Sequence, residues 1–246
     1  MQNQFDPRPT SGTRGGVNAA SVSVPRATRD VGLRSYMLSV YNYMASGVLL
    51  TGIVAMLFAS SGIAEQVMAT PLRWLIVLAP LGFVLAMSFG LNRMSTGTLQ
   101  TLFWAFAVAM GLSMSTIFLV YTGVSIAQTF FAVSAGFAGL SLWGYTTKKD
   151  LSGMGTFLIM GVVGLFIAML INLFLQSSAM HLAISAIGVL IFAGLTAYDT
   201  QRIKSMYDSV AGSDMMGKVV IMGALSLYLD FINMFMFLLS FMGDRH

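Results

Sequence analysis

Hydrophobic positions along this chain form long runs that short polar stretches separate. Residues 1–35 contain no such run and are rich in Ser, Gly, Pro, Asn and Arg. Seven apolar segments follow, each near the ~20 residues with which an α-helix crosses a hydrocarbon core of ~30 Å. The pattern therefore predicts an all-α integral membrane protein with seven transmembrane helices. By residue number the segments are 37–60, 72–91, 98–121, 126–146, 155–176, 180–202 and 219–242.

Composition supports this class of protein. Hydrophobic residues make up 57% of the chain and charged residues 9%, with a mean hydropathy of +0.80, whereas soluble domains carry roughly 25% charged residues. We expect two parts, a disordered cytoplasmic tail over 1–35 and a seven-helix transmembrane domain over 36–246. The tail lacks the apolar core of a signal peptide. The chain has no cysteine, which excludes disulfides and thiolate metal sites.

Basic residues predict the orientation, because cytoplasmic loops of membrane proteins hold an excess of Lys and Arg. If the first 35 residues are cytoplasmic, all but two of the 13 basic residues fall on the cytoplasmic side, the exceptions being Arg73 and Arg245. We therefore expect a cytoplasmic N-terminus and an exterior C-terminus. The net charge of +4 then reflects this excess of basic residues on the cytoplasmic side. They would face the anionic inner leaflet of the lipid bilayer, which is the expected partner. No basic face for nucleic acid is evident.

A few polar residues interrupt the apolar segments. An aspartate near the centre of a membrane helix costs roughly 3 kcal/mol, so Asp230 needs a compensating partner or a function. Ser226, Asp230 and Asn233 are spaced by four and three residues and share one helix face, which we expect to point inward as a supporting polar face. Asn42 belongs to a second polar stripe, on the first segment, spaced for an interface between helices.

A second carboxylate, Asp199, lies near the end of the sixth segment, one turn before Arg202. Asp199 could be an interfacial residue paired with Arg202, and Asp230 could be a protonated packing residue. The segment boundaries place the two carboxylates roughly 12 Å apart in depth, at 1.5 Å per residue. They can meet only if the sixth helix extends past Arg202 or the seventh begins later than residue 219.

Three motifs carry a resemblance to a known family: GYTTKKDLSGMG, GLTAYDTQRIK and ALSLYLDFINMFMFLL. Together they resemble the signature blocks of the Bax inhibitor-1 family, in its bacterial YccA-like branch, and the resemblance covers roughly residues 30–246. It implies a fold in which six helices surround a central seventh. It also implies a pH-sensitive calcium leak in a bacterial cytoplasmic (inner) membrane.

The resemblance also assigns roles to individual residues. It places a pH gate on Asp199 and Asp230, which would also be calcium ligands, and a latch to the first of these on Arg93. Calcium would be the transported ion, and no tightly bound cofactor is expected. One position departs from the pattern, because some calcium-conducting relatives carry an acidic residue near Gly82, and segment 72–91 has none.

These residues suggest a mechanism, with alternatives left open. Two nearby carboxylates in a poorly hydrated site would hold one shared proton, which closes the gate; losing it leaves two charges that suit a hard cation such as Ca²⁺. A non-conducting regulator that binds membrane proteins or a quality-control protease is the main alternative, which the missing second-helix carboxylate favours. A proton-coupled transporter is a third possibility. We expect no enzyme, since His181 and His246 cannot supply a zinc cluster.

Overall fold

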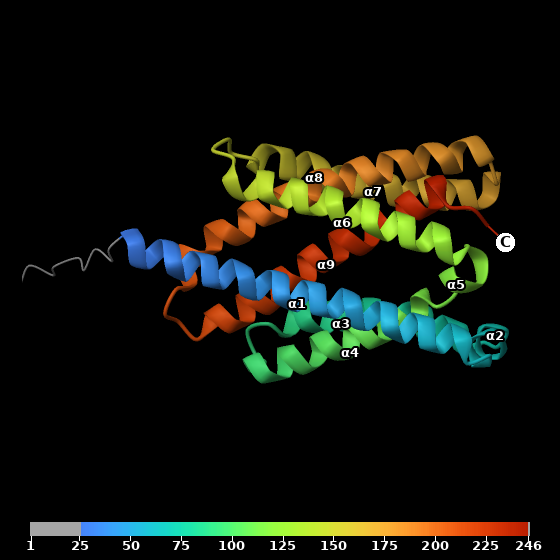
Figure 1. Ribbon diagram of the computed structural model, residues 1–246, viewed down its shortest axis with the longest axis horizontal. Coiled ribbons are helices and arrows are strands. Elements are labelled where there is room, and N and C mark those ends of the chain that lie inside the picture. The colour runs from blue at the N-terminus through green and yellow to red at the C-terminus, as the bar shows by residue number, and fades with distance from the viewer. Residues whose placement is uncertain (1–25, 246) are drawn as a thin grey trace, which may run out of the picture.

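The computed structural model describes residues 26–245, and in this part of the chain the secondary structure is helical apart from one isolated bridge between Tyr121 and Arg245. Seven of its helical spans are long and apolar enough to cross a membrane, as predicted, and together they form an all-α integral membrane protein (Figure 1). The helices are α1 (Arg26–Ser60), α2 (Ile63–Met68), α3 (Leu72–Gly90), α4 (Thr96–Met114), α5 (Ile117–Val120), α6 (Gly123–Thr146), α7 (Ser152–Leu175), α8 (Ser178–Val210) and α9 (Met215–Met242).

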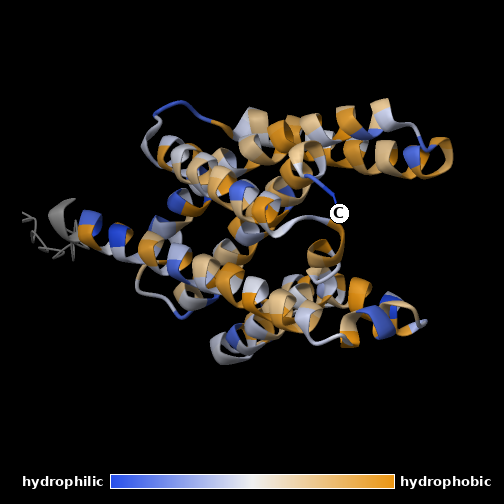
Figure 2. Ribbon diagram, turned by 45° about the vertical axis from the view of Figure 1, so that its right-hand side comes forward, coloured by the Kyte–Doolittle hydropathy of each residue, from blue (hydrophilic) through white to orange (hydrophobic). Residues whose placement is uncertain are grey.

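The bundle has two chemically different ends. The start of α1, the α3–α4 turn, the α6–α7 loop and the α8–α9 turn lie together at the left of Figure 1, and the C-terminus lies at the other end. Hydrophilic positions concentrate in these connections and hydrophobic ones along the helices between them (Figure 2). We call the left-hand end the basic end, because it carries most of the lysines and arginines of the described residues.

Helix α9 is the centre of the bundle. Within its most apolar window 67% of the residues are buried, against 11–39% in the other spans. It packs against α1, α4, α6 and α8, while α3 packs on α4 and α7 packs on α8 at the outside. The predicted central seventh helix is confirmed, with four of the other six spans as its main neighbours.

The basic end differs from the prediction in the lengths of two helices. Helix α1 begins at Arg26, so the predicted boundary at residue 35 is ten residues too late, and residues 1–25 of the predicted tail lie outside the described part. Helix α8 continues to Val210, well past Arg202. The two extensions stabilise one another, because the Tyr36 and Tyr207 rings lie 5.5 Å apart at their centroids, and Gly32 gives Tyr207 space that a Cβ would fill.

Two contacts fix the helices around the centre. Thr51 on α1 donates a hydrogen bond to the Ala107 carbonyl on α4 at 2.9 Å, so the Tyr228 hydroxyl on α9 donates to Thr51, at 2.6 Å. Gly144 brings α6 against the backbone of α8 at Ala197, where any Cβ would collide with the carbonyl. Both contacts are fully buried; the first ties α9 to α1 and α4, and the second ties α8 to α6.

Candidate functional site: two carboxylates on the central helices

Asp230 is the only acidic side chain that is fully buried among the described residues. Its side chain is 4% exposed, and Oδ2 has no hydrogen-bond partner in this part of the chain. The aspartate lies on α9 between buried Tyr228 and Phe231, so packing of the central helix removes it from solvent and lipid. An unpaired buried carboxyl oxygen costs about 1–3 kcal/mol of folding free energy. No hydrogen bond to Oδ2 from the described residues offsets this cost.

Asp199 faces Asp230 from α8. The Asp199 side chain is half-buried. Among the described residues, Asp199 is the charged group that acts electrostatically on Asp230. The extension of α8 past Arg202 brings their depths closer, although α9 begins at Met215 and so places Asp230 deeper than expected. Asp199 lies 11 residues before Val210, and Asp230 lies 15 residues after Met215. Since the helices are antiparallel, the remaining offset of four residues is roughly 6 Å, half of the depth difference expected from the sequence.

The two carboxyl groups do not bond directly to each other. Neither takes part in a hydrogen bond or ion pair within residues 26–245. The cation that acts on Asp199 is Arg202, one turn further along α8. The two aspartates thus interact only through their charges, and the Asp199–Arg202 proximity that formed the simpler interpretation is also present.

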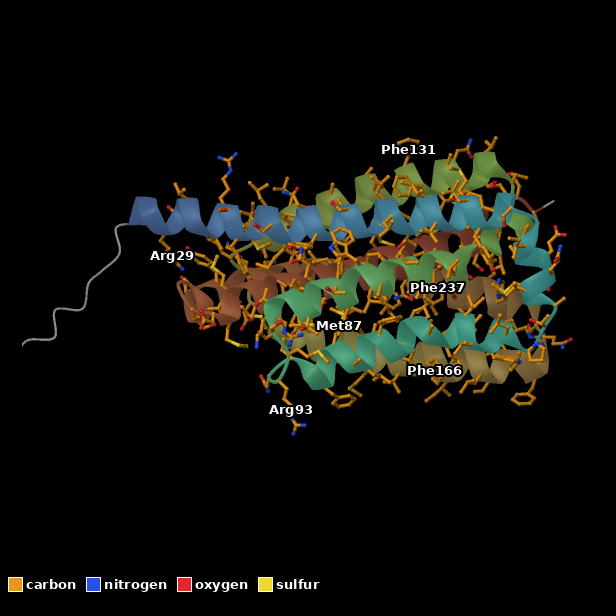
Figure 3. The ribbon with its side chains drawn as sticks, turned by 90° about the horizontal axis from the view of Figure 1, so that it is seen from below. Arg29, Met87, Arg93, Phe131, Phe166 and Phe237 are labelled. Atoms are coloured by element: carbon orange, nitrogen blue, oxygen red, sulfur yellow. The ribbon has the colours of Figure 1, made fainter. Side chains whose placement is uncertain are left out.

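Arg93 does not form the predicted latch in this structure. It lies in the α3–α4 turn, where its side chain is exposed and points away from the bundle (Figure 3). The physical reason is the position of α3, which packs on α4 at the outside, so that no interface with α8 is available for a latch. The end of α3 is instead tied to α9 by Lys218, which donates to the Leu91 carbonyl at 3.3 Å.

The ion pair that does cross between helices at the basic end joins α1 to α8. Arg29 engages both carboxylate oxygens of Asp208, and its Nε donates to Oδ1 at 2.7 Å. Both side chains are about half exposed. The sequence prediction missed this pair because it assigned Arg29 to the tail and residue 208 to a loop.

The predicted supporting polar face is only partly present. Ser226 and Asn233 are half-buried on α9, and Asn233 donates to the Leu229 carbonyl of its own helix at 2.8 Å instead of bonding to Asp230. Asn42 is exposed on the outer surface of α1, so its predicted place in a helix interface is wrong. A helix that is apolar on nearly every side gives little periodicity from which to tell the inner face.

Two cavities flank the Asp230 turn of α9. A cavity of about 630 Å³ lies between α1 and α6, and Phe231 forms part of its wall. Another, of about 590 Å³, lies between α7, α8 and α9 nearer the C-terminal end, and Asn233 and His181 line it. His181 lies in the first turn of α8, where its Nε2 is 2.8 Å from the Ser240 hydroxyl. Asp230 itself lines neither cavity and stays in the packed layer of α9 beside Phe231.

A chain of buried hydroxyls links α1, α6 and α8 beside the larger cavity. Thr200 donates to the Thr196 carbonyl at 2.7 Å, so Ser141 donates to Thr200 at 2.9 Å and Tyr41 donates to Ser141 at 2.6 Å. These residues were not singled out from the sequence, because isolated Ser, Thr and Tyr in apolar helices carry no spacing signal. The chain holds α6 against α8 next to Asp199.

The site has few of the ligands that a resident metal ion needs. Among the described residues no three His, Cys, Asp or Glu side chains come together in a group that could hold a metal ion. Ca²⁺ takes 6–8 oxygen ligands, and Asp199 and Asp230 alone fall far short of that number. The two carboxylates therefore do not form a closed binding cage.

The fold and the site define a polytopic integral membrane protein that is built around a central carboxylate-bearing helix. A model of the family described as "Inhibitor of apoptosis-promoting Bax1" matches residues 33–246. The chain belongs to this family, the Bax inhibitor-1 family, as its motifs predict.

Bacterial relatives span nearly the whole chain. RP147 of Rickettsia prowazekii is 50% identical over 220 residues, which cover 89% of this chain and 93% of that protein. The inner membrane protein YbhL of Escherichia coli K12 is 43% identical over 229 residues, covering 92% of this chain and 96% of YbhL. The membrane protein SpyM3_0260 of Streptococcus pyogenes is 36% identical over 218 residues, covering 87% of this chain and 94% of that protein.

Proposed function

We propose that this protein is a pH-sensitive cation leak, with Ca²⁺ as the transported ion, that the Asp199 and Asp230 pair gates. The observation that carries the proposal is the unpartnered Asp230 carboxyl on the central helix, within the field of Asp199. An ionisable group buried at this depth of a membrane protein is a mark of ion or proton pathways. Burying Asp230 lowers the stability of the protein, and no hydrogen bond to Oδ2 from the described residues compensates for that loss.

The orientation belongs to the proposal. The basic end faces the cytoplasm, because Lys and Arg gather there, and the opposite end faces the exterior of a bacterial inner membrane. The inner-membrane designation of the relative YbhL supports this location. Since the chain has no cysteine, the variants Gly12→Cys and His246→Cys each carry a single reactive thiol. We expect impermeant maleimide to label the first only from the cytoplasmic side and the second only from outside; labelling of both from one side would contradict the orientation.

The gate operates through charge. With one proton on the pair, a single negative charge remains, and Arg202 lies beside it on α8. When that proton leaves, two carboxylates repel across the α8–α9 interface while attracting a divalent cation. Repulsion pushes α8 from α9 and opens the packed layer between the two flanking cavities. Low pH therefore favours the closed state, and raised pH favours flux.

The Arg29–Asp208 pair supports closure at the basic end. It joins the extended start of α1 to the extended end of α8, so separation of these helices requires it to break. An exposed pair of this kind contributes about 0–1 kcal/mol, small enough for the charge change at the gate to overcome. This pair takes the place of the Arg93 latch that the sequence predicted.

A non-conducting regulator remains the second candidate, and one observation favours it. Helix α3 contains no acidic residue, whereas some calcium-conducting members of the family carry one in the corresponding helix. In that role the protein would bind other membrane proteins or a quality-control protease, and Asp230 would be a packing residue. Neither role involves a resident cofactor.

Calcium flux from proteoliposomes that contain only this protein tests the proposal. The expected result is a flux that rises with pH in the wild type and falls to the protein-free level at raised pH in Asp230→Asn, which keeps the shape of the side chain and removes its titration. Ser226→Ala, one turn away on α9, is the matched control and should keep the wild-type profile. Equal flux and pH profile in wild type and Asp230→Asn would refute the gate, and no flux in wild type at any pH would favour the regulator.

A further inference from the structure

A polar cleft at the basic end lies apart from the carboxylate site. It has a volume of about 310 Å³ and lies between the α6–α7 loop, the start of α7 and the last turns of α8. Three of its lining side chains are cations and two carry hydroxyls at the ends of helices. The cleft residues in these classes are Lys148, Lys149, Arg202, Ser152 and Ser205.

The walls of the cleft are held in place by α8. Gln201 accepts a hydrogen bond from the Leu151 amide at 2.9 Å and donates one to the Lys149 carbonyl at 2.8 Å. Tyr198, one turn earlier, packs directly against Gly155 at the start of α7. The backbone that carries the two lysines is therefore fixed on α8 on both sides of the cleft.

The cations of the cleft form no ion pair among the described residues. Within residues 26–245 none of Lys148, Lys149 and Arg202 forms an ion pair, whereas Arg29 at the same end of the bundle is paired with Asp208. The one carboxylate in the cleft, Asp150, accepts hydrogen bonds from the hydroxyl of Ser152 at 2.6 Å and from its amide at 2.9 Å. Three cations against one engaged carboxylate leave a net positive cleft.

The surroundings place the cleft close to a membrane surface. Trp143 and Leu142 are exposed in the last turn of α6, just before the loop that carries the lysines. Exposed tryptophan next to Lys and Arg is typical of the level of lipid headgroups. An anion that enters this cleft could thus come from a lipid or from the adjoining aqueous phase.

We propose that this cleft binds a phosphate group, either the headgroup of an anionic phospholipid or a soluble phosphate. The Arg202 guanidinium offers planar paired donors that match a phosphate, and Lys148 and Lys149 supply compact charges. The Ser152 and Ser205 hydroxyls already donate to Asp150 and to the Arg202 carbonyl, so the cations carry the recognition. Neither Asp199 nor Asp230 lines the cleft, so binding is distinct from the carboxylate gate.

The cleft has one link to that gate, and this consequence rests on the proposed function. Arg202 is also the cation that acts on Asp199. A phosphate that engages Arg202 draws its charge toward the cleft and weakens its attraction for the Asp199 carboxylate. Occupancy of the cleft would then change the pH range over which the leak opens.

Binding to the full chain in phosphatidylcholine nanodiscs tests the site without any flux measurement. One arm titrates phosphatidylglycerol into the disc and counts bound lipid by native mass spectrometry. The other adds inorganic phosphate, against chloride at equal ionic strength, and follows the melting temperature. The variant Lys148→Gln/Lys149→Gln removes two charges of the cleft, and the control Arg34→Gln/Arg93→Gln removes two exposed charges of the same end outside it.

We expect the lysine variant to bind about 25-fold more weakly, since each of its two basic residues near an anionic surface contributes roughly a factor of five. The control should stay within about twofold of wild type, because its charges act only at long range. A second variant, Arg202→Lys, keeps the charge without the paired donors and should lose part of the affinity.

Each arm identifies one source of the phosphate. Binding in the lipid arm alone assigns the cleft to a headgroup, binding in the soluble arm alone assigns it to a free phosphate, and both results support the site. Equal losses in the lysine variant and the control, or no binding in either arm, would overturn it. A protein that binds phosphate here and conducts no calcium would refute the leak and leave the cleft standing.

Discussion

Replacing Asp230 with leucine separates a functional carboxylate from a structural one. The two side chains have the same number of heavy atoms and branch at the same carbon, so Leu fits the buried position with little repacking. The substitution removes an oxygen that has no partner among the described residues. A buried unsatisfied polar group costs about 1–3 kcal/mol, and we expect Asp230→Leu to stabilise the protein by roughly that amount.

The assay is the apparent melting temperature of the purified protein in detergent micelles at neutral pH. For a chain of this size 1 kcal/mol corresponds to roughly 2–4 °C, so the expected rise is roughly 2–12 °C. The matched control is Asn233→Leu on the same helix, where the amide already has a partner in the Leu229 carbonyl. That variant measures the general effect of replacing a polar residue of α9 with leucine, and we expect no rise in its melting temperature.

The same variant should lose calcium flux at every pH. Gain of stability with loss of function is the signature of a residue that is retained for activity at a structural cost. A fall in the melting temperature of Asp230→Leu by more than the control would refute the reasoning, because the carboxyl group would then have a partner and a packing role.

Three further predictions concern the helices around the gate. Gly144→Ala places a methyl group against the backbone of α8 and should destabilise the protein by roughly 1–3 kcal/mol in thermal melts; an unchanged melting temperature would mean that α6 and α8 can separate freely. Tyr228→Phe removes the hydrogen bond to Thr51 and should cost about 1 kcal/mol, and a neutral result would show that the link does not hold α9. Hydrogen bonds from the Ser152 hydroxyl and amide lower the pKa of Asp150, so the stability they provide is present above the unfolded pKa of about 3.9 and is lost as pH falls through the lower folded pKa. The melting temperatures of wild type and Ser152→Ala should therefore differ at neutral pH and converge below about pH 4; a difference that persists there would exclude the carboxylate as its cause.

The sequence predicts the seven spans and the burial of Asp230, for a physical reason. Long apolar runs have few structural alternatives in a bilayer, and an aspartate within such a run is costly wherever it lies. The extensions of α1 and α8 could not be predicted in the same way. Their sequences are polar, and they are helical because each packs on the other through Tyr36 and Tyr207, a tertiary contact that no local pattern contains.

Side-chain partners were the least predictable feature. The family resemblance placed a latch to Asp199 on Arg93, but residues at the same end of the bundle meet only if their helices are neighbours, and α3 lies outside α4. The Asn42 stripe was expected in an interface between helices, yet Asn42 is exposed. Apolar residues lie on nearly every side of this helix, so their pattern does not indicate which side faces its neighbours. The observed pair, Arg29 with Asp208, depends on the same helix extensions that the sequence left undetermined.

The central claim is that Asp199 and Asp230 titrate as one unit over the pH range in which the leak opens. Infrared difference spectroscopy measures it directly, because a protonated carboxyl group has its own C=O stretching band. In wild-type proteoliposomes we expect one such band, which disappears over the pH range in which calcium flux rises. The band should be absent in Asp230→Asn and should titrate over a different pH range in Asp199→Asn. A band that is unchanged in Asp199→Asn, or that titrates outside the pH range of the flux, would contradict the account.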